Sequence, residues 1–428
     1  MKRFCIGLAA LAMVVAWPGC ALDQAHFERT LTGPGTPHPA LAMKPVPEGL
    51  GVNIHFYKGN AKDWAMLSEA GVGIVRMDIS WAGAEKKPGE YDFSHYDTLV
   101  GQLQQHHMRV IFILDYGNPL YDDGLSPHTD AGRAAYARFA SALAAHFAGK
   151  PVIWELWNEP NISFWKPSPN VGDYMAWCKA VVPAIRKADP NACIIGPASS
   201  RIDIKFLRGC FQRGLLKLVD GVSVHPYRGS KNPPETAVRE YKRLANMIAQ
   251  YKPKHRAGTV IPILSGEWGY TTAGVSRETQ GKYLPRQWLT NMAYGLPISI
   301  WYDWHDDGKD PKEREHNFGT VTWDYKPKPA YTAMKTLIAQ LGGYTAVGRL
   351  DTDKDDDYVV TLRKGGSVIL ACWTLGDAHT IDLGHEVHVI KAVNYLGKDA
   401  TVPEDGKVAL SDGPVYLTLR APYPKWLK

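Results

Sequence analysis

Short apolar runs alternate with segments of helical periodicity along most of the chain. This order predicts parallel βα units, and eight such units between residues 51 and 341 fit a (β/α)8 barrel. An open doubly wound sheet is the rival, but no glycine-rich phosphate-binding sequence follows the first run. The strand-like runs are 51–56, 74–81, 109–116, 152–159, 193–199, 221–227, 262–270 and 298–304. The helical segments are 62–70, 94–106, 130–147, 171–187, 203–213, 234–251, 276–294 and 329–341.

The pattern changes after residue 344. Runs such as YVVTLRK, SVILACWTL and VYLTLRAP are short, rich in β-branched residues and joined by Gly/Asp turns, which predicts a small all-β, sandwich-like domain. We therefore expect a catalytic barrel over residues 46–344 and a C-terminal β domain over residues 345–428. Residues 22–45 are proline-rich and irregular; they either add an edge strand to the β domain or simply lead into the barrel.

The first 21 residues have the pattern of a secretory signal peptide. Lys2 and Arg3 precede the apolar residues 4–17, and Gly19-Cys20-Ala21 supplies small residues at a cleavage site. The apolar run is too short for a membrane span. We expect cleavage after Ala21 and a periplasmic or extracellular protein. A lipoprotein anchored at Cys20 is the alternative, although the residues before it form a poor lipid-attachment motif.

Composition excludes several functional classes. Removal of Lys2 and Arg3 with the leader lowers the formal net charge from +6 to +4, because residues 1–21 contain no Asp or Glu; a charge this small does not indicate nucleic-acid binding. The remaining cysteines, Cys178, Cys193, Cys210 and Cys372, lack CxxC spacing, so we expect no zinc site. Export would permit a disulfide, such as Cys193–Cys210, but the sequence does not choose a pairing.

Polar and aromatic residues collect at the ends of the predicted strands, where (β/α)8 enzymes carry their chemistry. Two glutamates stand out, Glu159 after the fourth strand and Glu267 on the seventh. Two opposed carboxyl groups are what glycosidic-bond cleavage requires. Each could instead be an ordinary helix-start carboxylate, but their joint occurrence with Asn158 and Tyr227 favours catalysis. The other strand-end residues are Arg76, Asp78, Asp115, Tyr116, His225, Trp268, Trp301 and Asp303.

These residues lie in motifs that resemble clan A of the glycoside hydrolases. The motifs are WNEP at 157–160, SGEWG at 265–269, HPY at 225–227 and Arg76 on the second strand. Together with WELWNEPNISFW and FGTVTWDYKPKPAY, they are most similar to the β-xylosidase and α-L-iduronidase family, a group that also includes bacterial endoglycosidases acting on exopolysaccharide. The resemblance covers about residues 50–345 and implies a retaining enzyme on a (β/α)8 barrel, without a metal or cofactor.

The resemblance implies roles for the matching residues. Glu159 is expected to be the acid/base and Glu267 the nucleophile, with Arg76 and Tyr227 stabilising the ionised Glu267. Asn158 is placed to hydrogen-bond a sugar hydroxyl. His225 is expected to belong to the site because it precedes Tyr227 by two residues; a buried core histidine is the alternative.

The aromatic candidates are less specific. Trp301, on the eighth strand, is expected to form the platform for the reacting sugar, and Trp268 and Trp165 are candidates for sugar stacking; packing inside the fold is the alternative for all three. One departure from the clan is the third strand, where some families carry a histidine and this chain has Asp115 and Tyr116. The identity of the reacting sugar therefore stays open.

The sequence thus predicts a retaining glycoside hydrolase that acts on a polysaccharide or oligosaccharide, with carboxyl groups about 5–5.5 Å apart. Endo action is favoured because no loop is long enough to close one end of the cleft. The alternatives are an exo-acting glycosidase such as a β-xylosidase, and a non-catalytic carbohydrate-binding protein, which loss of either glutamate would favour. A metal-dependent barrel hydrolase would need a His-x-His pair on the first strand, which offers only His55.

Overall fold

The computed structural model describes residues 27–28, 30–31 and 33–427. The predicted signal peptide and Cys20 lie outside these residues. Within the described part of the chain, no helix combines the length and apolarity needed to cross a membrane.

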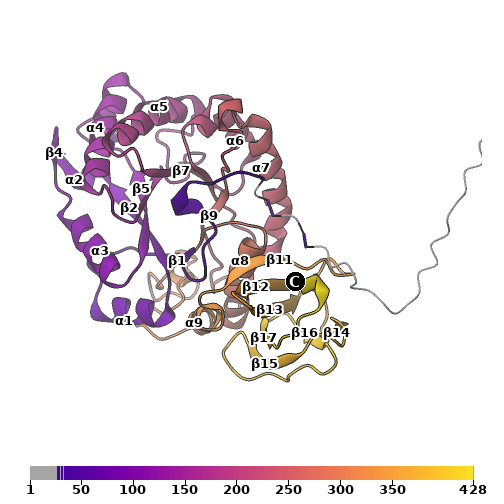
Figure 1. Ribbon diagram of the computed structural model, residues 1–428. Helices are drawn as coiled ribbons and strands as arrows, with labels where there is room; N and C mark the ends of the chain where they lie inside the picture. Colours follow the sequence, from indigo (N-terminus) through magenta and orange to yellow (C-terminus); the bar gives the residue numbers. More distant parts are fainter. Residues whose placement is uncertain (1–26, 29, 32, 428) are drawn as a thin grey trace, which may run out of the picture.

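A closed barrel of parallel strands forms the larger part of the molecule, as predicted (Figure 1). Its strands, in barrel order, are β1 (Leu50–Asn53), β2 (Ile74–Ser80), β5 (Arg109–Asp115), β6 (Val152–Leu156), β7 (Cys193–Ser200), β8 (Gly221–His225), β9 (Ile263–Trp268) and β10 (Ser299–Trp301). The surrounding helices are α1 (Ala61–Ala70), α3 (Ser94–Gln105), α4 (Asp130–His146), α5 (Val171–Ala188), α6 (Ile204–Gln212), α7 (Val238–Tyr251), α8 (Arg277–Ala293) and α9 (Pro329–Leu341). A short helix α2 (Trp81–Ala84) and a hairpin, β3 (Glu85–Lys87) with β4 (Glu90–Tyr91), follow β2.

The barrel interior is apolar at the end where the strands begin and polar where they end. The apolar layer is sealed from outside by Leu41, the last residue of the 3₁₀ helix Pro39–Leu41. The layer consists of Ile74, Ile111, Ile153, Cys193, Ile195, Leu264, Ile298 and Ile300. Because side chains alternate along a strand, the inward positions beyond this layer carry the polar residues of the site. The segment before residue 46 therefore closes the barrel at the end opposite to the chemistry.

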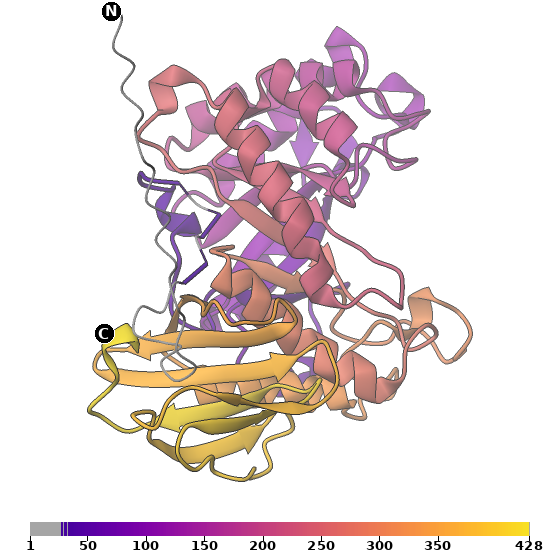
Figure 2. The same ribbon diagram turned by 90° about the vertical axis from the view of Figure 1, so that its right-hand side faces the viewer.

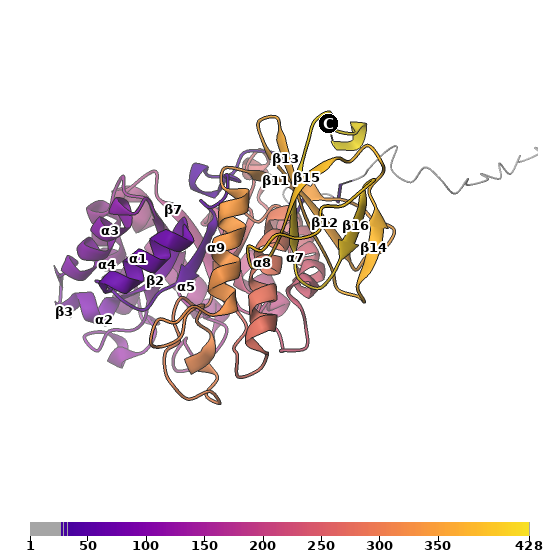
Figure 3. The ribbon, with the colours of Figure 1, turned by 90° about the horizontal axis from the view of Figure 1, so that it is seen from below.

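The C-terminal region forms two antiparallel sheets over one core, which confirms the predicted small all-β domain. The larger sheet has the order β11 (Thr345–Arg349), β12 (Asp357–Lys364), β13 (Ser367–Thr374), β17 (Val415–Leu419) and β15 (Val389–Asn394). The smaller sheet pairs β14 (His379–Asp382) with β16 (Lys407–Leu410). Figures 2 and 3 show the larger sheet lying against the barrel beside α7 and α8. Residues 27 and 28 also join this region, since Phe27 forms an antiparallel bridge with Leu350.

One alternative left open by the sequence is excluded, and several strands end earlier than predicted, the first at Asn53, the sixth at His225 and the eighth at Trp301. A Cys193–Cys210 disulfide does not form; all four described cysteines are free and buried. Cys193 lies in the apolar layer of the barrel, whereas Cys210 lies on α6 in the surrounding helical layer. The fourth strand also ends at Leu156, not at residue 159, because Trp157 and Glu159 have left-handed φ angles of 71° and 48°, which a strand cannot contain.

A buried ion pair joins the two domains. The Glu235 carboxylate, 3% exposed, accepts hydrogen bonds from Arg286 Nε at 2.7 Å and Nη2 at 2.8 Å. Its Oε1 also accepts from Trp373 Nε1 of β13 at 2.7 Å, and Arg286 Nη1 donates to the Asp412 carbonyl at 3.1 Å. Arg286 on α8 therefore links the barrel to the β domain.

Glu235→Gln is expected to lower the free energy of unfolding by about 3–5 kcal/mol, because it leaves a buried guanidinium without its counter-charge. Urea unfolding followed by circular dichroism measures the change. Glu90→Gln is the matched control, since Glu90 pairs with Lys87 at 3.4 Å where both side chains are exposed and such pairs contribute little. Equal effects of the two substitutions would contradict the role of Glu235.

Candidate active site

A cavity of about 720 Å³ opens where the barrel strands end. Most of the sequence-predicted polar residues line it, and they come from β2, β9 and the loops that follow β5, β6 and β8. The lining residues are Asn53, His55, Arg76, Asp78, Tyr116, Asn158, Glu159, Ile162, Phe164, Ser200, Arg201, Tyr227, Arg228, Gly229, Glu267, Tyr302, Arg314 and Glu315. The chain thus brings both candidate glutamates into one concave space.

Arg76 is the centre of the polar layer beneath this cavity. Its guanidinium is fully buried and donates to Glu155 Oε2 at 2.5 Å and to Glu267 Oε2 at 2.5 Å. Burial alone would lower the pKa of Arg76, but the two carboxylates outweigh it and raise that pKa. Glu155 is not among the site residues predicted from the sequence. It lies two residues after Ile153, which faces the barrel interior, so strand alternation could have placed it there.

Glu267 is held on both carboxylate oxygens. Arg76 donates to Oε2, and the Tyr227 hydroxyl donates to Oε1 at 2.8 Å. Burial and the neighbouring Glu267 raise the pKa of Tyr227 well above its ordinary value, so the phenol keeps the proton that it donates. Glu267 therefore receives one hydrogen bond from a positively charged group and one from a neutral hydroxyl.

The glycines around Glu267 in SGEWG are required for close packing. A Cβ on Gly266 would lie 2.2 Å from Ser223 Oγ and 3.1 Å from Glu155 Oε1. A Cβ on Gly269 would lie 1.9 Å from the Tyr302 carbonyl oxygen. The first glycine makes room for the polar layer, and the second lets the chain after β9 approach the chain after β10.

Glu159 lies three residues beyond β6 and, like Trp157, has left-handed backbone. Its backbone N–H donates to the Ala198 carbonyl of β7 at 3.0 Å, which fixes the segment against the neighbouring strand. The side chain is 7% exposed. Left-handed backbone is costly for residues other than glycine and concentrates at functional sites.

His225 connects the two glutamates. Its Nε2 lies 3.2 Å from Arg76 Nη2, and its Nδ1 lies 2.9 Å from Glu159 Oε1. Because arginine can only donate, Nε2 accepts and Nδ1 carries the ring proton that is donated to Glu159. One oxygen of Glu159, one oxygen of Glu267 and a ring nitrogen of His225 all lie within 4.8 Å of one another.

Asn158 is oriented by contacts at both ends of its amide. Arg76 Nη2 donates to Oδ1 at 3.0 Å, and Nδ2 donates to the Tyr116 hydroxyl at 2.8 Å. Tyr116 therefore lines the cavity at the position where some clan A families have histidine. Asp115, by contrast, is 1% exposed and does not contact the cavity. Burial, with a contribution from nearby Asp78, raises the pKa of Asp115 well above its ordinary range.

The three tryptophans predicted to contact sugar do not line the cavity. Trp301 and Trp268 are 0% exposed and Trp165 is 1% exposed, so the stacking prediction is wrong and the packing alternative describes them. Trp268 and Trp301 are register partners on β9 and β10. Since Trp268 follows the inward-facing Glu267, strand alternation turns both away from the cavity. Tyr302, the next residue after Trp301, supplies the aromatic ring at this position.

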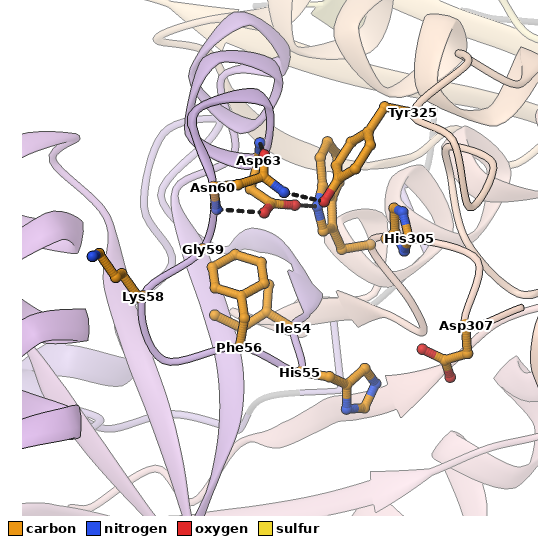
Figure 4. Close-up of a pocket in the computed structure, with 11 residues that line it drawn as sticks. Ile54, His55, Phe56, Lys58, Gly59, Asn60, Asp63, His305, Asp307 and Tyr325 are labelled. Carbon is orange, nitrogen blue, oxygen red and sulfur yellow. Dashed lines mark hydrogen bonds between the residues drawn. The ribbon is translucent and has the colours of Figure 1, made fainter.

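Figure 4 shows the residues around a second cavity of about 490 Å³. His55 lines both cavities, so they adjoin at this residue. The loop after β1 contributes Phe56 and Asn60, and the loop after β10 contributes His305, Asp307 and Tyr325. Asn60 Nδ2 donates to the Tyr325 hydroxyl at 2.5 Å, which ties the two loops together. The cavity therefore combines aromatic rings with polar groups.

His55 and Asp303 form an ion pair at the junction of the two cavities. Nε2 of His55 lies 3.5 Å from Asp303 Oδ2, and Asp303 is fully buried. Burial opposes the charged imidazole, but Asp303 outweighs it and raises the pKa of His55 to about 9. Burial also raises the pKa of Asp303 to about 7, against the effect of His55. The exposed part of the pair is the imidazole.

Known proteins resemble this chain in sequence and in fold. The family model described as cellulase (glycosyl hydrolase family 5) matches residues 42–328. A β-xylosidase from Geobacillus stearothermophilus is 26% identical over 437 residues, covering 92% of this chain and 77% of the relative.

Two solved structures show the same fold. A family 39 glycoside hydrolase from the gut symbiont Bacteroides cellulosilyticus WH2 is 24% identical, with a TM-score of 0.76 over 88% of this chain and 81% of the other. A GH30 endoxylanase from Clostridium papyrosolvens C71 is 13% identical, with a TM-score of 0.60 over 91% of this chain and 100% of the other.

Proposed function

Because the chain belongs to the cellulase family, glycosyl hydrolase family 5, we propose that it cleaves internal O-glycosidic bonds of a polysaccharide by double displacement, with Glu267 as nucleophile and Glu159 as acid/base. The family assignment makes the protein a retaining glycoside hydrolase of clan A and confirms the resemblance seen in the sequence. The glutamate roles, the substrate and the endo mode are the parts that we propose.

The spacing of the two glutamates carries the proposal. A carboxylate oxygen of Glu159 and one of Glu267 lie within 4.8 Å of each other. Retaining enzymes have carboxyl groups about 5–5.5 Å apart, whereas inverting enzymes need about 6.5–9.5 Å to admit a water molecule. Such close oxygens favour direct attack of one carboxylate on the anomeric carbon over attack by a water molecule placed between the two groups.

The environment of Glu267 suits a nucleophile. Arg76 and Tyr227 hold its oxygens and favour the anion before attack. When the glycosyl–enzyme bond forms, that negative charge disappears and Arg76 keeps its second partner, Glu155. The buried guanidinium is therefore never left without a counter-charge during the reaction.

The environment of Glu159 suits a proton donor. His225 Nδ1–H donates to Oε1, so in the neutral acid Oε1 is the accepting carbonyl oxygen and Oε2 carries the proton. That proton is transferred to the leaving glycosidic oxygen. Loss of the Glu267 charge in the intermediate then favours ionised Glu159, which accepts a proton from the attacking water.

Asn158 is positioned to bind the reacting sugar. Its Oδ1 accepts from Arg76 and one Nδ2 hydrogen is donated to Tyr116. The second Nδ2 hydrogen is left to donate to a sugar hydroxyl, an interaction that strengthens in the transition state.

The two adjoining cavities support endo action. They meet at His55, so a chain of several sugars can continue from the catalytic cavity toward Phe56 and Tyr325, whose rings offer apolar faces. Exo action is the second candidate function, because the Geobacillus relative is named a β-xylosidase.

Digestion of a panel of polysaccharides, followed by size analysis of the products, distinguishes the two modes. We expect early release of oligosaccharides of mixed length and a rapid loss of polymer viscosity. Glu267→Ala is the matched control and is expected to release nothing. Release of single sugars from chain ends, with the polymer length unchanged, would contradict endo action and favour the exo alternative.

A further inference from the structure

Three arginines line the catalytic cavity in addition to the buried Arg76. Arg201 follows β7, Arg228 follows β8, and Arg314 lies in the loop between β10 and α9. They share this cavity with Glu159 and Glu267. A cavity whose chemistry needs two carboxyl groups thus also carries three permanent positive charges.

Arg201 lies close to the proton donor. The Glu159 N–H donates to the Ala198 carbonyl, three residues before Arg201 in the chain. Arg201 also forms an antiparallel bridge with His225, whose ring contacts Glu159. Because the acid protonates the leaving oxygen, Arg201 lies on the side of the cavity that receives the leaving part of the substrate.

Arg228 and Arg314 have carboxylate partners. Arg228 Nη2 lies 2.6 Å from Glu240 Oε2, and its guanidinium lies 5.8 Å from the centre of the Trp268 ring. Arg314 pairs with Glu315 and lies over the Phe318 ring at 4.9 Å. Both guanidinium groups are therefore positioned by the protein itself.

Arg201 differs from them. It is exposed, and within the described residues its guanidinium has no ion pair or hydrogen bond. Its backbone is left-handed, with φ of 57°, and Ser199 Oγ donates to its carbonyl oxygen at 2.9 Å. A bulky residue in this conformation is costly and is maintained only where the surroundings hold it. The backbone thus presents an uncompensated charge at the cavity.

We propose that Arg201, which lines the same cavity as Arg228 and Arg314, binds the carboxylate of an acidic sugar unit on the leaving-group side, so that the substrate is an anionic polysaccharide. This inference rests on the proposed function. The planar guanidinium fork matches a carboxylate at two points. The unpaired charge of Arg201 also offsets part of the repulsion that the cavity carboxylates, Asp78, Glu159, Glu267 and Glu315, exert on an anionic chain.

The test is calorimetric binding of acidic tetrasaccharides to the Glu267→Gln protein, which does not turn them over. The probes are oligomers of galacturonate, glucuronate and mannuronate, each compared with its carboxyl-reduced neutral counterpart. We expect at least one acidic oligomer to bind roughly tenfold or more tightly than its neutral form, the scale of hydrogen bonds to a charged group. The preference should shrink at high salt.

Arg201→Gln in the same background is expected to remove this preference. Arg208→Gln is the matched control, since Arg208 is exposed on α6 and does not line the cavity; it should keep the preference. Equal binding of acidic and neutral oligomers, or equal effects of the two substitutions, would overturn the proposal. Tighter binding of sulfated than of uronate oligomers would overturn the carboxylate assignment.

The two proposals fail in different ways. Glu267-dependent hydrolysis of neutral glycans, with no preference for acidic ones, would overturn the inference about Arg201 and leave the hydrolase function intact. Arg201-dependent binding of an acidic oligomer that the unmodified enzyme never cleaves would support the binding site and contradict the proposed catalytic function.

Discussion

Glu267→Gln is expected to lower kcat on the natural polysaccharide by on the order of 10⁴-fold or more, the scale seen when a catalytic group of a covalent mechanism is removed. Glutamine cannot attack the anomeric carbon as a carboxylate does. The fold should survive, because Arg76 keeps its ion pair with Glu155 and the glutamine oxygen can still accept a hydrogen bond from Arg76 or Tyr227. Release of reducing ends measures the rate, and urea unfolding measures the stability.

Glu315→Gln is the matched control for this substitution. Glu315 lines the same cavity but its side chain is half exposed and pairs with Arg314. We expect its loss of kcat to be far smaller than that of Glu267→Gln. Comparable losses of kcat would mean that catalysis depends on the total negative charge of the cavity, and they would contradict a nucleophile at Glu267.

Glu159→Ala is expected to affect substrates according to their leaving groups. On the natural glycan, whose leaving oxygen needs a proton, the first step should slow by about 10²–10⁴-fold. On a dinitrophenyl glycoside, whose leaving group departs as an anion, the first step should change little. Stopped-flow measurement should then show a burst of dinitrophenol, because the variant also lacks the base that activates water for the second step.

Azide provides an internal check on this variant. A small anionic nucleophile needs no general base, so added azide should raise the turnover of the dinitrophenyl glycoside and yield a glycosyl azide. Equal losses on both substrates, or no effect of azide, would contradict the acid/base role of Glu159.

The barrel could be predicted from the sequence because the pattern of apolar runs and helical segments is periodic and repeats along the chain. Apolar strands buried on both sides alternate with amphipathic helices, and each helix forms close to its predicted position. The ends of strands were less predictable. At Trp157 and Glu159 the backbone is left-handed, and the Glu159 N–H donates to the Ala198 carbonyl, a partner that lies far along the chain and leaves no local pattern.

The polar members of the site were predictable because each lies in a short motif at a strand end. Arg76, Asn158, Glu159, His225, Tyr227 and Glu267 all meet at one network, although their catalytic roles stay predictions. The prediction for the tryptophans was wrong because a position near a strand end does not show whether the side chain points into the cavity or away from it. Strand alternation gives this direction. Trp268 follows the inward-facing Glu267 and therefore points outward, whereas Glu155 lies two residues after the inward-facing Ile153 and therefore points inward.

The arginines and the second cavity were not predictable. Arg201, Arg228 and Arg314 come from three loops whose spatial order depends on the closed barrel. The contact between Asn60 and Tyr325 joins residues that are 265 positions apart. Only the folded chain shows that these groups border the cleft.

Mass spectrometry of the trapped enzyme tests the central claim most directly. A 2-deoxy-2-fluoro glycoside with a dinitrophenolate leaving group, built on the sugar that the enzyme cleaves, forms the glycosyl–enzyme but slows its hydrolysis. Our account predicts one added glycosyl group on the peptide that contains Glu267, and none in the Glu267→Gln protein. A stable adduct on Glu159, Glu155 or any other carboxylate would contradict it.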